Sequence, residues 1–279
     1  MMDFFSVMGK PLLACLILTG IHAYLGMHVI ERKVIFVDLA LAQIAAFGAT
    51  LAFLFHFDLH SHETYGFSLV ATFLGAAIFA LTRTRDDKIP HEAIIGTVYA
   101  VTAAATILIL SRTPEGDEHI RHILVGNVLL VTDGELIKMI LLYGLMGLFH
   151  WKFREKFWMI SKIHHITYEQ RRYVRFWDLL FYGTFGFVVT SSVQVAGVLL
   201  VFSFLIVPSI IGMLFGKSFQ SRLFWGWGVG IFASIFGMAS SFSFDLPTGA
   251  SVVCIFGLML LMAGIFTKVK EKRAIAANP

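Results

Sequence analysis

The chain has 279 residues, of which 57% are hydrophobic and only 14% are charged, and its mean hydropathy is +0.79. A soluble domain is about one quarter charged and less than half apolar, so this composition excludes an ordinary globular enzyme and a disordered chain. The formal net charge of +4 is too small to imply nucleic-acid binding. The only cysteines, Cys15 and Cys254, exclude a disulfide framework and a multi-cysteine metal site. The sequence therefore predicts an integral membrane protein.

Nine apolar runs follow one another along the chain. A bilayer core about 30 Å thick requires roughly 20 apolar residues per helix. The runs are 11–30, 34–55, 67–81, 93–110, 136–149, 176–192, 195–215, 223–242 and 250–266. Only Ser191, Ser192 and Gln194 interrupt the stretch 176–216 strongly, and we expect two helices to meet there. The predicted fold class is all-α: a polytopic membrane helical bundle of about eight or nine transmembrane helices, forming a single transmembrane domain over residues 1–279.

Basic residues lie on alternate connections between these runs. Lysine and arginine concentrate at 32–33, 83–88, 152–175, 217–222 and 268–273, whereas 57–66 and 243–249 contain none. The positive-inside rule then places the N-terminus outside and the C-terminus in the cytoplasm. The longest polar stretch, 151–175, has room for one amphipathic helix at the membrane surface.

The chain shows no pattern of its own for catalysis or for ATP. A His-Glu-x-x-His zinc helix is absent. The stretch from Gly212 to Ser218 superficially resembles a phosphate-binding loop, but it has three residues between its glycines where the motif needs four. We therefore predict no catalytic residues and no permanently bound cofactor, and if the protein pumps, ATP must be hydrolysed on a partner subunit.

Five segments carry a family resemblance. They are VIFVDLALAQIAAFG (34–48), EAIIG (92–96), LVGNVL (124–129), VAGVLLVFSFLIVP (195–208) and DLPTG (245–249). In this order they resemble the permease subunits of metal-ion ABC importers, which carry zinc, manganese or iron. The resemblance covers about 34–266. It implies an importer of a divalent transition metal, zinc ahead of manganese or iron, in a bacterial inner membrane.

The same resemblance implies the partners and the fold. It implies a second copy of the chain, an ABC ATPase subunit on each permease and an extracytoplasmic metal-binding protein, in the fold of the cobalamin and iron-chelate importers. In that fold the helix ending near Pro208 runs into a short coupling helix, here about 209–222, that contacts the ATPase. Proline breaks a helix, which agrees with this boundary. The coupling residues implied here are Ser209, Gly212, Gly216, Lys217 and Arg222.

The second apolar run offers polar residues for a pathway, because polar groups inside a membrane usually face a cavity or each other. Many members of the family carry an aspartate and a histidine four residues apart here. An ungapped comparison places Leu39 and Gln43 at those positions, with Asp38 displaced by one residue, so the histidine is missing. We expect Asp38 and Gln43 to line the pathway. His22 of the first run either supplies the missing imidazole or is a histidine hydrogen-bonded between helices.

The connection after the second run is rich in possible metal ligands. If this segment is extended, alternation places His56, Asp58, His60 and His62 on one side. Imidazole with carboxylate suits zinc, iron, nickel or manganese. A second outer loop, 115–122, adds acids and two histidines. The sequence therefore predicts metal capture by the first loop, with interface packing or binding-protein docking as the alternative.

Two other functions stay open at this stage. The same architecture could carry an iron chelate or cobalamin, which needs a wide cavity and no metal ligands. A His-rich membrane metalloenzyme would need ligands converging at one depth, whereas these histidines are scattered along the chain.

Overall fold

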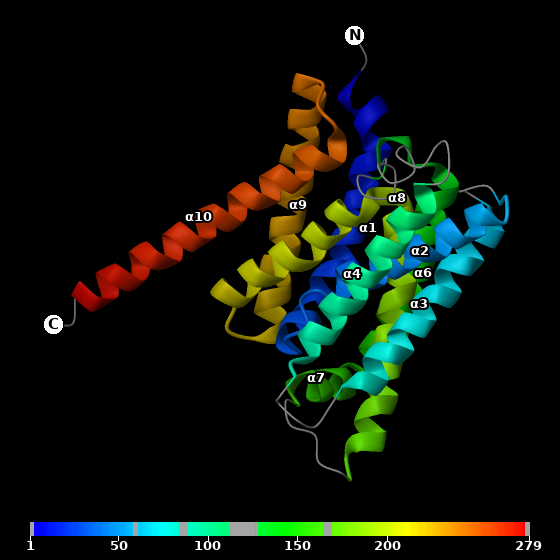
Figure 1. The fold of residues 1–279 in the computed structure, drawn as a ribbon. Coiled ribbons are helices and arrows are strands. Elements are labelled where there is room, and N and C mark those ends of the chain that lie inside the picture. The colour runs from blue at the N-terminus through cyan, green and yellow to red at the C-terminus, as the bar shows by residue number, and fades with distance from the viewer. Residues whose placement is uncertain are drawn as a thin grey trace.

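The computed structural model describes residues 3–57, 61–83, 89–111, 126, 128–163 and 169–276, with side chains as far as residue 270. Within these residues every regular element is a helix (Figure 1). In chain order they are α1 (Phe4–Glu31), α2 (Val37–Leu54), α3 (His62–Thr82), α4 (His91–Leu110), the 3-10 turn η1 (Val128–Leu130), α6 (Asp133–Lys152), α7 (Arg154–Lys162), α8 (Arg171–Phe215), α9 (Phe219–Phe244) and α10 (Thr248–Ala276). The predicted all-α fold is confirmed.

Seven of the described helices are long and apolar enough to cross a membrane, and α6 with α7 forms an eighth, bent by 74°. Helix α8 has 45 residues, far more than one crossing of a 30 Å core requires. Gly197, with φ 74° and ψ 162°, separates it into two helices. Two helices therefore meet in this stretch as predicted, slightly beyond the three polar residues. Counting the two halves separately gives the nine predicted segments within the described chain.

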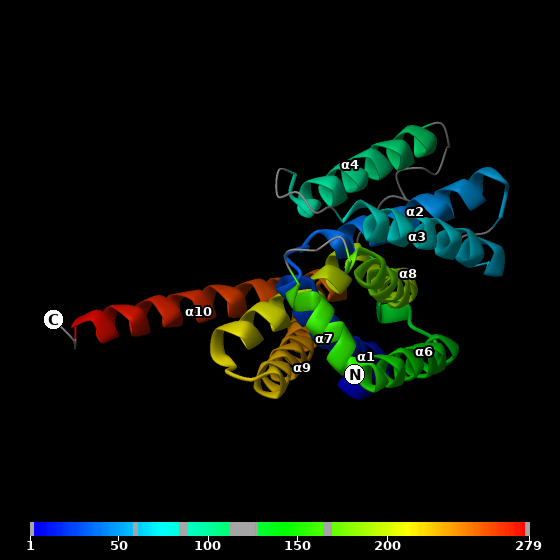
Figure 2. The same cartoon turned by 90° about the horizontal axis from the view of Figure 1, so that it is seen from below.

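Helix α8 is the centre of the bundle. It packs against α1, α3, α9 and α10, and α1 also packs on α9, while α2 lies between α3 and α4. The first residues of α1 lie at one end of the bundle and α7 lies at the other (Figure 1). Helix α10 packs on α9 and α8 near its start and then extends away from the other helices (Figure 2).

Small residues set the close approach of α9 to its neighbours. A Cβ on Gly230 would lie 2.4 Å from Thr19 Cγ2 of α1, and a Cβ on Gly226 would lie 3.3 Å from the Pro208 carbonyl oxygen of α8. Gly228, between them, faces open space. Small residues at this spacing let membrane helices pack closely. The Gly226–Gly230 pair therefore serves packing within the bundle.

Candidate functional site

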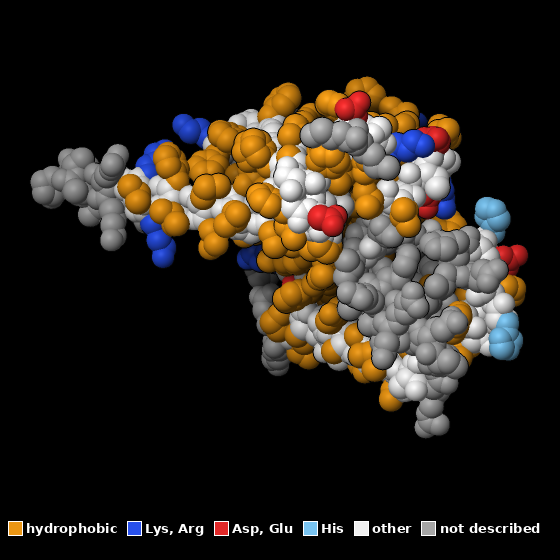
Figure 3. Space-filling model, turned by 90° about the horizontal axis from the view of Figure 1, so that it is seen from above, with side chains coloured by type: hydrophobic (Ala, Val, Ile, Leu, Met, Phe, Trp, Pro, Cys, Tyr) orange, Lys and Arg blue, Asp and Glu red, His pale blue; other side chains and the backbone are white. Residues whose placement is uncertain are grey.

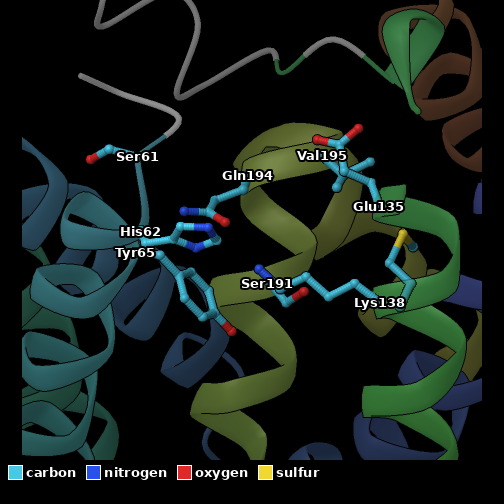
Figure 4. A pocket seen from close by; sticks show the side chains of 9 residues that line it. Ser61, His62, Tyr65, Glu135, Lys138, Ser191, Gln194 and Val195 are labelled. Carbon is cyan, nitrogen blue, oxygen red and sulfur yellow. The ribbon is translucent and has the colours of Figure 1, made fainter. Parts of the chain in front are cut away.

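A polar pocket of about 150 Å³ lies where α3 and α6 begin and α8 bends (Figure 4). His62 and Gln194 lie close together on one wall, and Lys138 enters from α6 (Figure 4). Lys138 Nζ is 3.7 Å from the centre of the Tyr65 ring, a cation–π contact. The Glu135 carboxylate caps its own helix by accepting from the Thr132 amide and hydroxyl. The Lys138 ammonium group lies inside this pocket and repels a divalent cation electrostatically, so the pocket does not favour metal binding.

The predicted histidine loop is only partly described. Asp58 and His60 lie outside the described residues, as does the second outer loop, 115–122. His56 is exposed with φ 66°, and His62 is the exposed first residue of α3. The condition for that arrangement, one extended segment, is therefore not met at its two ends, because His56 has a left-handed backbone and His62 is helical. Histidine side chains show at one edge of the face seen from above (Figure 3).

No group of three or more histidine, cysteine, aspartate or glutamate side chains converges within the described residues. Metal capture by His56 and His62 together with Asp58 and His60 thus stays a prediction.

Asp38 is the most unusual polar residue on α2. It lies in the first turn, is only 1% exposed, and neither carboxylate oxygen has a hydrogen-bond partner in the described part of the chain. Gln43 is also buried, and its Nε2 donates to Thr106 Oγ1 of α4 at 3.4 Å. Residues five apart on an α-helix point about 140° apart. The two polar groups therefore lie on different faces of α2, and both carboxylate oxygens of Asp38 are without a partner in the described residues.

His22 does not join these residues. Its Nδ1 is 2.9 Å from the Leu18 carbonyl oxygen, one turn earlier on α1, and its ring packs edge-on against Tyr143 of α6. Helix α1 packs mainly on α8 and α9, whereas α2 packs mainly on α3 and α4. The hydrogen bond of His22 thus stays within α1, and its buried Nε2 has no partner among the described residues, so a pathway role for His22 stays a prediction.

The expected helix break at Pro208 is wrong. Helix α8 continues through Pro208 to Phe215, and the chain turns at Gly216 before α9 begins at Phe219. The ring lacks only one backbone donor, and the buried Ser209 hydroxyl donates nearby to the Leu205 and Ala23 carbonyl oxygens. The stretch 209–222 is therefore the end of one helix, a turn and the start of the next, and not a separate helix.

Glycines make this turn tight. A Cβ on Gly212 would lie 2.4 Å from the Arg222 carbonyl oxygen, and a Cβ on Gly216 would lie 2.6 Å from the Arg222 amide nitrogen. The Arg222 side chain also bonds to this turn: its Nε donates to the Gly216 carbonyl oxygen at 3.2 Å. Lys217 is exposed at the tip. Four of the five predicted coupling residues thus form one compact corner, and Ser209 ties it to α1.

An ionic cluster that the sequence did not reveal lies at the same end of the bundle. Asp178 of α8 is fully buried and accepts hydrogen bonds from two arginines that directly follow helices, Arg32 after α1 at 2.5 Å and Arg83 after α3 at 2.8 Å. A charged residue near the end of a span is ordinarily solvated or caps a helix. Asp178 is buried instead, because α1 and α3 both end beside it and bring arginines from connections that the sequence shows to be basic.

These features define a class of protein: a multi-pass helical membrane protein with polar groups inside the bundle. Comparison with known proteins gives the family. The chain belongs to the ABC 3 transport family, which matches residues 4–267. The predicted resemblance is confirmed.

Individual relatives are also named as membrane proteins of metal transport systems. The chain is 25% identical over 268 residues to a "Probable iron transport system membrane protein" of Haemophilus influenzae, covering 95% of this chain and 96% of that protein. It is 27% identical over 205 residues to the "Manganese transport system membrane protein MntB" of Synechocystis, covering 72% and 63%. Its fold is similar to the solved structure of PsaBC from Streptococcus pneumoniae in complex with Fab, with a TM-score of 0.74, 21% identity, and 93% and 94% of the two chains covered.

Proposed function

We propose that this chain is the transmembrane subunit of an ATP-driven importer for a divalent transition metal. Membership of the ABC 3 transport family over residues 4–267 carries the proposal. The chain acts as one transmembrane domain in a bacterial inner membrane and forms the pathway, while a separate ATPase subunit supplies the energy. An extracytoplasmic binding protein delivers the metal.

Asp38 is the residue that we assign to the metal. Its two buried oxygens have no hydrogen-bond partner among the described residues, and an unpaired buried carboxylate is costly unless a cation or donor reaches it. Oxygen ligands without imidazole suit manganese better than zinc. The names of the relatives, iron and manganese, point the same way, so we propose manganese or iron ahead of the zinc that the histidine loop suggests.

Metal uptake by cells tests this assignment. A host that lacks its own importers would express the chain with its ATPase and binding protein, and uptake of radioactive manganese, iron and zinc would be measured. Asp38→Asn should lower uptake at least about tenfold, as expected when a metal loses a ligand. The control is Asp133→Asn, because Asp133 forms only an exposed ion pair with Lys10. Equal uptake by both variants would refute the assignment of Asp38.

The position of Gln43 offers a gain-of-function test. Gln43→His places an imidazole where many family members carry one. Imidazole favours zinc more than an amide oxygen does, so the ratio of zinc to manganese uptake should rise. An unchanged ratio would show that Gln43 does not face the metal.

Partners and orientation belong to the same proposal. The ATPase contacts the corner formed by Gly212, Gly216, Lys217 and Arg222. A second copy covers exposed apolar side chains on the projecting part of α10, among them Leu258, Leu261, Met262, Ile265 and Phe266. We place the N-terminus outside and the C-terminus in the cytoplasm.

Cysteine labelling in intact cells tests the orientation. In a Cys254→Ser background, His62→Cys should react with a membrane-impermeant maleimide, whereas Lys217→Cys should react only after the cells are opened. Both side chains are exposed at their positions. The reverse pattern would invert the topology. Purification in mild detergent should recover an ATPase subunit with the chain, and a chain that comes out alone in several detergents would contradict the importer proposal.

A further inference from the structure

Helix α7 is a basic amphipathic helix at the end of the bundle opposite the N-terminus (Figure 1). Phe157, Ile160 and Ser161 are fully buried, and the helix packs against α1 and α8. Lys156 is exposed and Met159 is about half exposed on the other side. The 74° bend from α6 turns α7 across the direction of that span. A helix of this kind lies in the plane of a membrane interface.

Cations and aromatic rings are paired along this helix. Four basic side chains each lie within 6 Å of a ring centre: Lys152 over Phe153, Arg154 over Trp151, Lys156 over Trp177 and Lys162 over Trp158. The only acid between residues 151 and 162 is Glu155. Amphipathic cations resting on aromatic rings are typical of the layer where a membrane carries its phosphate groups.

A cavity of about 180 Å³ opens beside α7. Its walls come from three helices: Tyr24 and His28 of α1, Phe219 of α9, and Arg154, Glu155 and Trp158 of α7. The interior is mostly apolar and aromatic, and Trp158 and Phe219 pack edge-on with ring centres 4.8 Å apart. Such walls fit the apolar part of a lipid better than a small polar solute.

Two buried polar atoms in these walls have no hydrogen-bond partner within the described residues: the Tyr24 hydroxyl oxygen and His28 Nε2. The Ser161 hydroxyl donates to the Phe157 carbonyl oxygen, so His28 Nδ1, 2.9 Å from Ser161 Oγ, must be the donor there. His28 Nε2 is then an acceptor, and the Tyr24 hydroxyl can donate. Leaving such groups unpaired is unfavourable, which indicates a ligand that offers both a donor and an acceptor.

We propose that this cavity and the adjoining basic face of α7 bind one anionic phospholipid. The phosphate lies at Arg154, and the glycerol and the upper acyl chain lie against Trp158 and Phe219. An ester oxygen accepts from the Tyr24 hydroxyl, and a hydroxyl-bearing headgroup such as that of phosphatidylglycerol donates to His28 Nε2. Charge selects the lipid, because Arg154 lines the cavity and residues 151–162 carry four cations against one acid, Glu155, whose Oε1 lies 3.9 Å from Arg154 Nη2.

Native mass spectrometry of the detergent-purified chain, with whatever subunits accompany it, tests the site by titration with phosphatidylglycerol and with phosphatidylcholine. One phosphatidylglycerol molecule should bind in preference to phosphatidylcholine. Arg154→Gln should weaken phosphatidylglycerol binding about fivefold, and Glu155→Gln should strengthen it. Lys270→Gln is the matched control, because Lys270 is an exposed cation on the projecting α10. Equal losses in Arg154→Gln and Lys270→Gln would show diffuse charge attraction and overturn the proposal.

Fluorescence locates the bound lipid. Phosphatidylglycerol with brominated acyl chains should quench tryptophan emission at one lipid per chain, and Trp158→Phe should remove the quenched component. Glycerol 3-phosphate, which has the phosphate without acyl chains, should not displace the lipid. Unchanged quenching in Trp158→Phe would place the lipid elsewhere. Full displacement by glycerol 3-phosphate would show a site for free phosphate instead, and either result would overturn the proposal.

Discussion

Gly212→Ala tests the contact that joins the end of α8 to the start of α9. The added Cβ would lie 2.4 Å from the Arg222 carbonyl oxygen, whereas ordinary contact begins near 3.4 Å. The two segments must therefore separate by about 1 Å, because the clashing atom belongs to the backbone. Overpacking of this kind costs about 1–3 kcal/mol. If this corner transmits the conformational change of the ATPase subunit to the helices, a displacement of that size should reduce metal transport per ATP hydrolysed.

A graded series of glycines separates coupling from general damage. Gly228→Ala adds a Cβ in open space and should leave transport and stability unchanged. Gly226→Ala, whose closest contact is 3.3 Å, should have an intermediate effect. Each variant would be reconstituted with the ATPase in proteoliposomes, and metal uptake, ATP hydrolysis and thermal unfolding would be measured together.

The expected result is that Gly212→Ala keeps ATP hydrolysis and assembles normally but loses most uptake. Normal uptake per ATP hydrolysed in Gly212→Ala would refute the assignment of this corner to coupling. A loss of assembly equal to the loss of uptake would show that the contact serves only the fold.

Three further substitutions test the bundle. Asp178→Asn leaves both guanidinium groups without a counter-charge, so the free energy of unfolding should fall by about 3–5 kcal/mol, measured as a lower unfolding temperature in detergent. Gly197→Ala forces a side chain into a conformation that is essentially reserved for glycine and should cost about 1–3 kcal/mol, whereas Gly183→Ala, with its closest contact at 3.8 Å, should be neutral. Tyr143→Phe removes a 2.6 Å hydrogen bond to Ser192 and should cost about 1 kcal/mol; an unchanged unfolding temperature would show that the bond contributes nothing.

The sequence by itself determined the class of protein and the outline of its fold. Apolar runs of bilayer length predict helices because a backbone inside lipid must satisfy its own hydrogen bonds, and this physical rule needs no tertiary information. The same reasoning located the meeting of two helices within 176–216, which the structure places at Gly197.

Only the tertiary structure decided which polar residues meet. Three charged residues near span ends are far apart in the chain: Arg32, Arg83 and Asp178. The helix ends that carry them converge in the structure, which buries the three side chains together. Pro208 was expected to end a helix, but α8 continues through it because a proline removes only one donor and neighbouring groups can compensate. Whether a polar side chain faces a partner, a cavity or nothing depends on helix rotation and contact. Local sequence does not fix those quantities, so it could not show that the carboxylate oxygens of Asp38 and the Nε2 atom of His22 are buried without a partner among the described residues.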